Sequence, residues 1–245
     1  MIISTPIFLW LSYQMPKDFE LIIFDMDGTL YPVSAEMDSI YPIVALECAA
    51  KSDNRQPAEI KADFEQKRAE LARYLNGTPT STLTLMYFYD ADMHAFEMEI
   101  TRRILTKKYV QPDARTIRVI DAIAQFYPIF LFTTNNRLTA EKILGQLQLA
   151  DYFPPERRFT FSDINALPIS KTEKINFMKP STKGFEHILE KCGANPNRTL
   201  MVGDSETMDI EPARRLGMEI YHVTEPALLY ALPEWLEIEH NDKKI

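Results

Sequence analysis

The first clear feature of the chain is a short apolar run, Leu21 to Phe24, that ends directly at a pair of acids. A continuous apolar run of this length, followed by polar residues and a glycine, predicts a buried strand. Asp25, Asp27 and Gly28 then stand at the carboxyl end of that strand.

From about residue 34 to about residue 115, the apolar positions change to a helical spacing. In the first part of this region, Met37, Ile40 and Val44 fall at roughly helical intervals. Helices are predicted at 35–51, 57–75 and 83–109, with the turn signal Asn76-Gly77 before the third. The region contains no clear strand.

After about residue 112, apolar strands alternate with amphipathic helices. Further strands are predicted at 128–135, 158–162, 198–204 and 219–224. Helices are predicted at 114–126, 137–149, 182–193 and 211–217. This alternation is typical of a parallel sheet with helices on both faces. The sequence therefore predicts an α/β fold, a Rossmann-like parallel sheet with an inserted all-helical domain.

The predicted organisation has three parts. They are an N-terminal extension at 1–14, an α/β core domain at 15–32 and 112–245, and a helical domain at 33–111. The extension has a short apolar run, but it lacks a basic region, contains Pro6 and is too short to span a bilayer. We expect it to take no part in the chemistry, and we expect a cytoplasmic protein with no membrane partner. The C-terminal tail from Glu237 is expected to be solvated.

The composition is that of an ordinary globular protein, with 46% hydrophobic and 25% charged residues. A formal net charge of −8 argues against a nucleic-acid partner, because such partners require clustered Lys and Arg. Cys48 and Cys192 are far apart and lack metal-ligand spacing, so we expect two buried thiols in a reducing compartment. A monomer or a homodimer is expected.

Polar residues follow three of the predicted strands at their carboxyl ends, where parallel sheets bind ligands. They are Asp25, Asp27 and Gly28, then Thr133, Thr134 and Asn135, then Gly203, Asp204 and Ser205, with Asp209 shortly after. Carboxylates from two strands would meet in one cleft, where their repulsion is costly unless they share a cation or a proton. Mg²⁺ prefers such carboxylate oxygens.

A lysine completes the predicted site. Lys179 precedes a predicted helix, with Pro180 at or near the first helical position. An ammonium group there could balance a nucleophilic carboxylate and hold an anionic substrate. Lys171 and Lys174 compete for this role, but only Lys179 has the following proline and helix. Phosphoryl transfer is indicated by this combination of an acid pair, a hydroxyl group, a lysine and a second acid pair.

The order of these motifs resembles that of the haloacid dehalogenase superfamily. The matching pieces are DMDGT at Asp25 to Thr29, TN at Thr134-Asn135, KP at Lys179-Pro180 and GDSETMD at Gly203 to Asp209. Each piece alone is weak, but all four in this order form a strong signal. The resemblance covers the chain after about residue 19, and the helical insertion matches the C1-type helical cap domain of subfamily I.

The resemblance implies roles for the acids. Asp25 would be the nucleophile that forms an aspartyl-phosphate, and Asp27 would be the general acid and then the general base. Asp25, the backbone carbonyl of Asp27, and Asp204 would bind Mg²⁺. Asp209 would orient Lys179 or a water ligand of the metal, with Ser205 beside it. Haloacid dehalogenases proper lack an acid at the place of Asp27, which favours phosphate over halide chemistry.

The resemblance also implies how the phosphoryl group is held. Thr134 and Lys179 would bind it, with Gly28 and Asn135 lining the same phosphate site. Both Thr133 and Thr134 offer a hydroxyl, and Thr134 is favoured because the hydroxyl residue of the family usually stands directly before Asn or Gly. The substrate would be a small phosphorylated metabolite.

Substrate choice in such enzymes comes from the cap. DGTLYPVS, the loop before LTLMYFYDAD and VQPDARTIRVIDAI resemble the pyrimidine 5'-nucleotidase-like branch of the superfamily, but the segments LNGTPTSTLTLM and NALPISKTEKINFM depart from it. The aromatic cluster at 86–96 could stack on a nucleobase or form core. His94 and His222 are interpreted as packing or surface residues.

Three functions therefore compete. The first is a Mg²⁺-dependent phosphatase acting on a nucleoside 5'-monophosphate, or alternatively on a sugar phosphate or phosphoglycolate. The second is a phosphomutase with the same site residues. The third is a non-catalytic binding or regulatory protein, which the intact acids disfavour.

Overall fold

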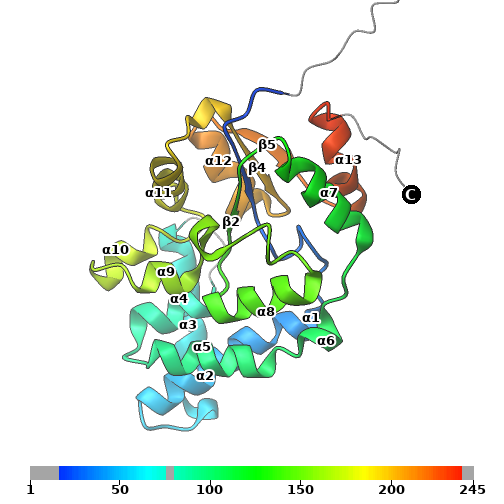
Figure 1. The fold of residues 1–245 in the computed structure, drawn as a ribbon. Coiled ribbons are helices and arrows are strands. Elements are labelled where there is room, and N and C mark those ends of the chain that lie inside the picture. Colours follow the sequence, from blue (N-terminus) through cyan, green and yellow to red (C-terminus); the bar gives the residue numbers. More distant parts are fainter. Residues whose placement is uncertain (1–16, 76–79, 239–245) are drawn as a thin grey trace, which may run out of the picture.

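The centre of the protein is a five-stranded parallel sheet (Figure 1). The computed structural model describes residues 17–75 and 80–238, so the predictions for 1–14, for Asn76-Gly77 and for most of the tail lie outside it. The strand order is β3-β2-β1-β4-β5. The strands are β1 (Leu21–Phe24), β2 (Ile129–Phe132), β3 (Arg158–Phe159), β4 (Thr199–Gly203) and β5 (Glu219–His222). Because β1 is the central strand, the acids that follow it lie at the middle of the carboxyl edge of the sheet.

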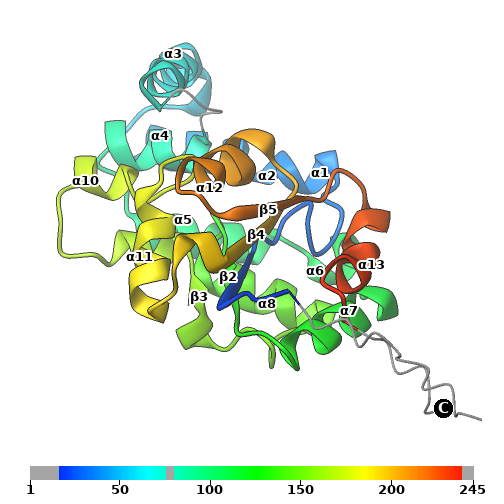
Figure 2. The same cartoon turned by 90° about the horizontal axis from the view of Figure 1, so that it is seen from above.

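Alternate residues of β1 pack into cores on opposite faces of the sheet, as the pleat requires. Ile22 and Phe24 join the core formed with α7 (Ala114–Ala124), α8 (Arg137–Leu147) and α13 (Pro226–Trp235). Leu21 and Ile23 join the core formed with α11 (Lys183–Cys192) and α12 (Glu211–Arg215). Figure 2 shows α12 on one side of the sheet and α7 and α8 on the other. The predicted helix-covered parallel sheet is confirmed.

Six helices between β1 and α7 gather beyond the carboxyl ends of the strands (Figure 1). They are α1 (Ala35–Asp38), α2 (Ile40–Ser52), α3 (Pro57–Leu75), α4 (Ser81–Phe88), α5 (Met93–Arg103) and α6 (Thr106–Tyr109), here called the helical layer. Within residues 35–75 and 80–109 there is no strand, as predicted. Lys142 on α8 donates to the carbonyls of Thr101 (2.8 Å) and Ile104 (2.7 Å), which ties the layer to the core.

Several elements differ from the sequence prediction because local caps interrupt the apolar pattern. The helix predicted at 83–109 is three helices, since Asp92 caps α5 by accepting from Ala95 N. The strand predicted at 158–162 ends at Phe159, because Thr160 and Asp163 form a capping box that starts α9 (Phe161–Asn165). α10 (Lys171–Ile175) and α13 were not predicted. Short 3₁₀ turns, Pro155–Arg157 and Pro196–Arg198, precede β3 and β4.

Two residue-level predictions are wrong. Pro180 does not lie at the start of a helix, because α11 begins at Lys183 after the N-cap Thr182. Cys192 is exposed, whereas a buried thiol was expected, and Cys48 is only partly buried. Neither cysteine forms a disulfide.

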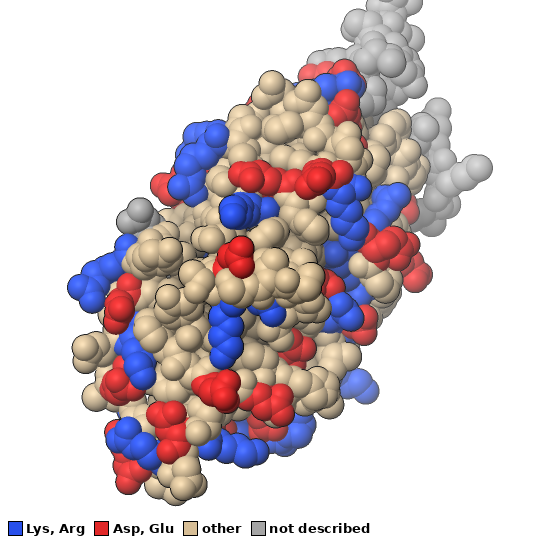
Figure 3. Space-filling model, turned by 90° about the vertical axis from the view of Figure 1, so that its left-hand side faces the viewer, with Lys and Arg blue, Asp and Glu red and all other residues tan. Residues whose placement is uncertain are grey.

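Surface charge and helix length bear on possible partners. Lys and Arg are interspersed with Asp and Glu over the face drawn in Figure 3. Among residues 17–75 and 80–238, no helix combines the length and apolar character needed to cross a membrane.

Candidate active site

Lys179 lies between two acids at the carboxyl edge of the sheet. Its Nζ is 2.7 Å from Oδ1 of Asp25 and 2.6 Å from Oδ1 of Asp209. Asp25 follows β1, Lys179 lies in the turn before α11, and Asp209 belongs to a π-helical turn, Glu206–Ile210, after β4. Only 1% of the Lys179 side chain is exposed, so its contacts with the two acids are shielded from water. Three elements far apart in the sequence thus form one buried charge cluster.

Burial and neighbouring charges set the protonation of this cluster. Burial raises the pKa of Asp25 and of Asp209, and the positive charge of Lys179 opposes both changes. Burial alone would lower the pKa of Lys179, but the charges of Asp209 and Asp25 outweigh it and raise that pKa above its ordinary value. Lys179 therefore remains an ammonium ion.

A third acid, Asp204, approaches the same place from the end of β4. One carboxylate oxygen from each of Asp25, Asp204 and Asp209 lies within 4.8 Å of the others. Gly28 allows this approach, because a Cβ at that position would overlap the Asp204 carboxylate. The φ angle of Gly28 is +84°, which a residue with a side chain rarely adopts. The backbone at Gly28 therefore takes a conformation that favours glycine, and the acids are close enough to share a cation.

The second acid of the pair, Asp27, is held at both oxygens. The hydroxyl of Tyr31 donates to Oδ1, and the side-chain amide of Asn135 donates to Oδ2. Burial raises the pKa of Asp27 to about 7, and the negative charge of Asp25 adds to the effect. A carboxyl group with such a pKa can both give and take a proton near neutral pH.

The two threonines that follow β2 have different environments. Thr133 is fully buried, and its Oγ1 accepts from the backbone N–H of Asn135 at 3.1 Å. Thr134 instead lines a cavity at the edge of the sheet. A ligand in the cavity therefore has access to Thr134 and not to Thr133.

Gly28 and Asn135 are predicted to line the phosphate site, but their backbone amides are engaged within the protein. The N–H of Gly28 donates to the Tyr31 carbonyl at 3.0 Å, and that of Asn135 is used by Thr133. At the start of α8, the N–H of Arg137 donates to Ser162 Oγ at 2.9 Å. Phosphate contact through Asn135 or Gly28 thus remains a prediction.

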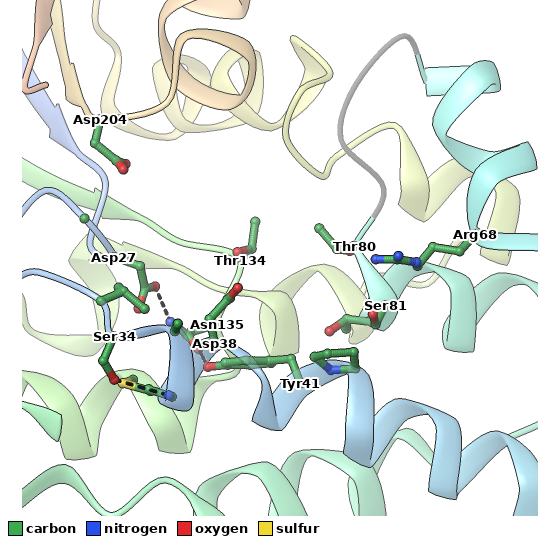
Figure 4. A pocket seen from close by; sticks show the side chains of 16 residues that line it. Asp27, Ser34, Asp38, Tyr41, Arg68, Thr80, Ser81, Thr134, Asn135 and Asp204 are labelled. Carbon is green, nitrogen blue, oxygen red and sulfur yellow. Dashed lines mark hydrogen bonds between the residues drawn. The ribbon is translucent and has the colours of Figure 1, made fainter. Parts of the chain in front are cut away.

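A cavity of about 700 Å³ lies between the sheet edge and the helical layer. Its floor includes Asp27, Thr134 and Asp204. Arg68 and Ser81, from α3 and α4, lie on the opposite side (Figure 4). The volume is in the range of small-molecule sites. The cavity thus extends from Asp204 of the acid cluster, which is Asp25, Asp204 and Asp209 with Lys179 between them, to the helical layer.

The competing lysines lie elsewhere. Lys171 pairs with Asp90 at 3.6 Å and is mostly exposed, and Lys174 donates to the Asn165 carbonyl. Neither reaches Asp25, so among the three lysines considered only Lys179 lies in the acid cluster.

Sequence reasoning missed two features of the site. Nε2 of His222, at the end of β5, is 2.8 Å from the carbonyl oxygen of Asp204, although His222 was interpreted as a packing or surface residue. The hydroxyl of Tyr41, on α2, donates to Oδ1 of Asn135. Both partners are distant in sequence, so only a fold-level prediction could have found them.

The fold and the site together define an enzyme with a buried carboxylate centre at the edge of a Rossmann-like sheet. The chain belongs to the haloacid dehalogenase-like hydrolase family, whose sequence model matches residues 19–217. A protein of Haemophilus influenzae described only as uncharacterized is 22% identical over 214 residues, which cover 87% of this chain and 95% of that protein.

Solved structures share the fold at low sequence identity. A HAD phosphatase from Thermococcus onnurineus has a TM-score of 0.53 at 20% identity, covering 90% of this chain and 99% of its own. A 2-haloacid dehalogenase from Pseudomonas syringae has a TM-score of 0.54 at 18% identity, covering 89% and 98%. The magnesium-bound HAD-hydrolase YfnB from Bacillus subtilis has a TM-score of 0.50 at 21% identity, covering 83% and 88%.

Proposed function

We propose that this hydrolase is a Mg²⁺-dependent phosphatase that cleaves a small phosphate monoester through an aspartyl-phosphate on Asp25. The observation that carries the proposal is the contact of Lys179 with Asp25, next to Asp27 and Asp204, and the last two acids line the floor of the cavity. This arrangement offers a nucleophile, a fixed positive charge and a proton carrier at one place.

The acid cluster fits a magnesium ion by its donor set. Both oxygens of Asp209 already accept hydrogen bonds, from Lys179 at 2.6 Å and from Ser205 N at 3.1 Å. Asp25 and Asp204 would therefore hold the ion, together with the backbone carbonyl of Asp27. Magnesium would neutralise the acids so that an anionic phosphate can approach them. YfnB, which shares the fold, binds magnesium.

In the first step, a carboxylate oxygen of Asp25 attacks phosphorus and the bond to the leaving oxygen breaks. The carboxyl group of Asp27 transfers its proton to that oxygen, and the alcohol leaves. Lys179 balances the charge of Asp25 before the attack, and Thr134 donates to a phosphoryl oxygen. Asp209 holds Lys179 in place throughout, since it shares the ammonium with Asp25.

In the second step, the Asp27 carboxylate takes a proton from water as the water oxygen attacks phosphorus. The bond between Asp25 and phosphorus breaks, which releases inorganic phosphate and restores both acids. One group serves both steps because both need a proton carrier beside the same phosphorus. The pKa of Asp27, about 7, suits both roles.

Halide displacement is the chemistry of one structural neighbour, the 2-haloacid dehalogenase. A halide leaves without a proton, so that reaction has no use for an acid at position 27. The buried, doubly hydrogen-bonded carboxyl group of Asp27 therefore favours an oxygen leaving group.

We propose that the helical layer is the cap of residues 33–111 and that it recognises the leaving group. A nucleoside 5'-monophosphate is the first candidate substrate, and a sugar phosphate or phosphoglycolate is the second. The aromatic cluster at 86–96 gives no support for base stacking, because Tyr89 and Phe96 are buried and no residue of the cluster lines the cavity. Tyr41 does line the cavity and would take that role.

The proposal is tested by incubating the protein and Mg²⁺ with a panel of phosphorylated metabolites and measuring released phosphate. Release from UMP or CMP in preference to other esters would support the nucleotide assignment. Release from sugar phosphates or phosphoglycolate would shift the substrate class. Isomerised product without phosphate would favour a mutase, and no turnover of any ester would contradict the phosphatase.

A further inference from the structure

A chain of hydrogen bonds connects the side chain of Asp27 to two other segments of the protein. Tyr31, in the loop after β1, donates to Oδ1, and Asn135, between β2 and α8, donates to Oδ2. Tyr41, on α2 of the helical layer, donates to Oδ1 of Asn135. Figure 4 shows Asp27, Asn135 and Tyr41 one after another along one wall of the cavity. The last link therefore joins the helical layer to the sheet edge.

The direction of each hydrogen bond is fixed by chemistry. Burial raises the pKa of Tyr41 well above its ordinary value, so its hydroxyl keeps its proton and donates. The Asn135 amide accepts through its oxygen and donates through its nitrogen. With Tyr41 on the oxygen, the nitrogen must face Asp27. If the amide were reversed, its oxygen would face Oδ2 of Asp27, and whenever Asp27 is a carboxylate neither oxygen could donate.

The rest of Asn135 is also immobilised. Its backbone N–H donates to Thr133 Oγ1 at 3.1 Å, and only 3% of the residue is exposed. The amide can thus exchange its two ends only by rotation of its terminal torsion. Among the described residues, Tyr41 is the hydrogen-bond partner of the amide oxygen. The Tyr41 hydroxyl therefore holds the amide in the orientation in which its nitrogen donates to Asp27.

We propose that Tyr41 is a positioning residue that orients Asp27 through Asn135 for proton transfer to the leaving oxygen. The inference rests on the proposed function. Tyr41 belongs to α2, while Asp27 and Asn135 follow strands of the sheet, so Asp27 is fully held only while α2 lies against the sheet edge. Proton transfer is in this way tied to the placement of the helical layer.

The test uses Tyr41→Phe, which keeps the ring and removes the hydroxyl. The substrates are a series of substituted phenyl phosphates, whose leaving groups differ in acidity but hardly in size. For kcat/KM, which reports the steps up to release of the phenol, poor leaving groups need the proton of Asp27 and good ones need it less. We expect kcat/KM to fall roughly tenfold or more for phenyl phosphate and much less for 4-nitrophenyl phosphate.

Tyr89→Phe is the matched control. Tyr89 also lies in the helical layer, is buried, and donates to Asp63 at 3.0 Å, but it does not line the cavity. Its variant should lower kcat/KM for all members of the series equally, or not at all. If Tyr41→Phe acted only by removing a buried hydroxyl from the structure, it too would lower kcat/KM equally for all members of the series, or not at all.

A double variant tests whether Tyr41 acts through Asn135. Asn135→Ala alone should steepen the dependence of kcat/KM on the acidity of the leaving group. Adding Tyr41→Phe should steepen it little further, because the two residues act as one unit. An unchanged dependence in Tyr41→Phe, or additive effects in the double variant, would overturn the inference while wild-type turnover upheld the phosphatase. A wild-type protein that hydrolyses no member of the series would overturn both.

Discussion

The ammonium of Lys179 lies 2.7 Å from the carboxylate of Asp25, although 154 residues separate them in the sequence. The same ammonium lies 2.6 Å from Asp209, so one buried positive charge serves two buried acids. Breaking a buried ion pair leaves an uncompensated charge, which costs more than a surface pair gains. A substitution in this cluster should therefore lower both the stability of the fold and the activity of the site.

Lys179→Met keeps the length of the side chain and removes its charge. We expect the free energy of unfolding to fall by about 3–5 kcal/mol, as for other broken buried pairs. Urea unfolding would measure it. Lys171→Met is the control, because Lys171 pairs with Asp90 at 3.6 Å on the surface and should change stability by less than about 1 kcal/mol. Equal losses of unfolding free energy in the two variants would contradict the conclusion that Lys179 is a buried charge compensated by two acids.

Gly28→Ala should separate backbone strain from damage to the acid cluster. Gly28 and Gly193 both have positive φ angles, +84° and +63°, so alanine at either position should destabilise the fold by about 1 kcal/mol. Only at Gly28 would the new Cβ meet Asp204, whereas no atom of the described residues lies within 4 Å of a Cβ at Gly193. Phosphatase activity and Mg²⁺ binding should fall in Gly28→Ala and persist in Gly193→Ala. Equal activity in both variants would show that the contact with Asp204 is unimportant.

Magnesium should stabilise the wild-type protein. A ligand at a concentration of 100 times Kd contributes about 2.7 kcal/mol, which raises Tm by roughly 5–10 °C in a chain of this size. Thermal unfolding with added Mg²⁺ and then with chelator would measure the shift. Asp204→Asn should lose most of it, while Asp90→Asn, at an exposed acid away from the cluster, should keep it. A Tm that does not change with magnesium would contradict the proposal that the acids bind the ion.

The raised pKa of Asp27 has a defined effect on stability in the presence of chelator. Burial raises this pKa from 3.8 to about 7, so between these values the folded protein holds a proton that the unfolded chain has lost. The stabilisation is complete below the lower value and is lost as pH rises through the higher one. From about pH 5 to about pH 8, wild type should lose stability relative to Asp27→Asn, as measured by urea unfolding at each pH. A constant difference between the two proteins would mean that Asp27 has an ordinary pKa.

The sequence predicted the parts of the fold that local patterns determine. The apolar run before Asp25 and the alternation after residue 112 are sufficient to predict a parallel sheet with the acids at its edge. α10 was missed because five residues are too few to show a helical period. The helix predicted at 182–193 is present as α11, but Pro180 was wrongly expected at or near its first position, because the preference of proline for a first turn was weighed above the cap at Thr182.

The site was predicted as far as its motifs extend. Lys179 was identified by its proline and the following helix, and it does meet Asp25. Tyr41 could not be identified, because it lies in an ordinary helical pattern and its partner Asn135 is 94 residues away. His222 is similar, since its contact with Asp204 depends on the pairing of β5 with β4. Contacts of this kind follow from the packed fold and leave no local spacing in the sequence.

In the proposed reaction, Asp25 carries the phosphoryl group between the two steps. Wild-type protein with Mg²⁺ and 4-nitrophenyl phosphate, quenched in acid during turnover and digested, should give a peptide containing Asp25 with the mass of one added phosphoryl group. Asp25→Asn should give neither this peptide nor released phosphate. Phosphate release by wild type with no modified Asp25, or undiminished release by Asp25→Asn, would show that Asp25 is not the nucleophile.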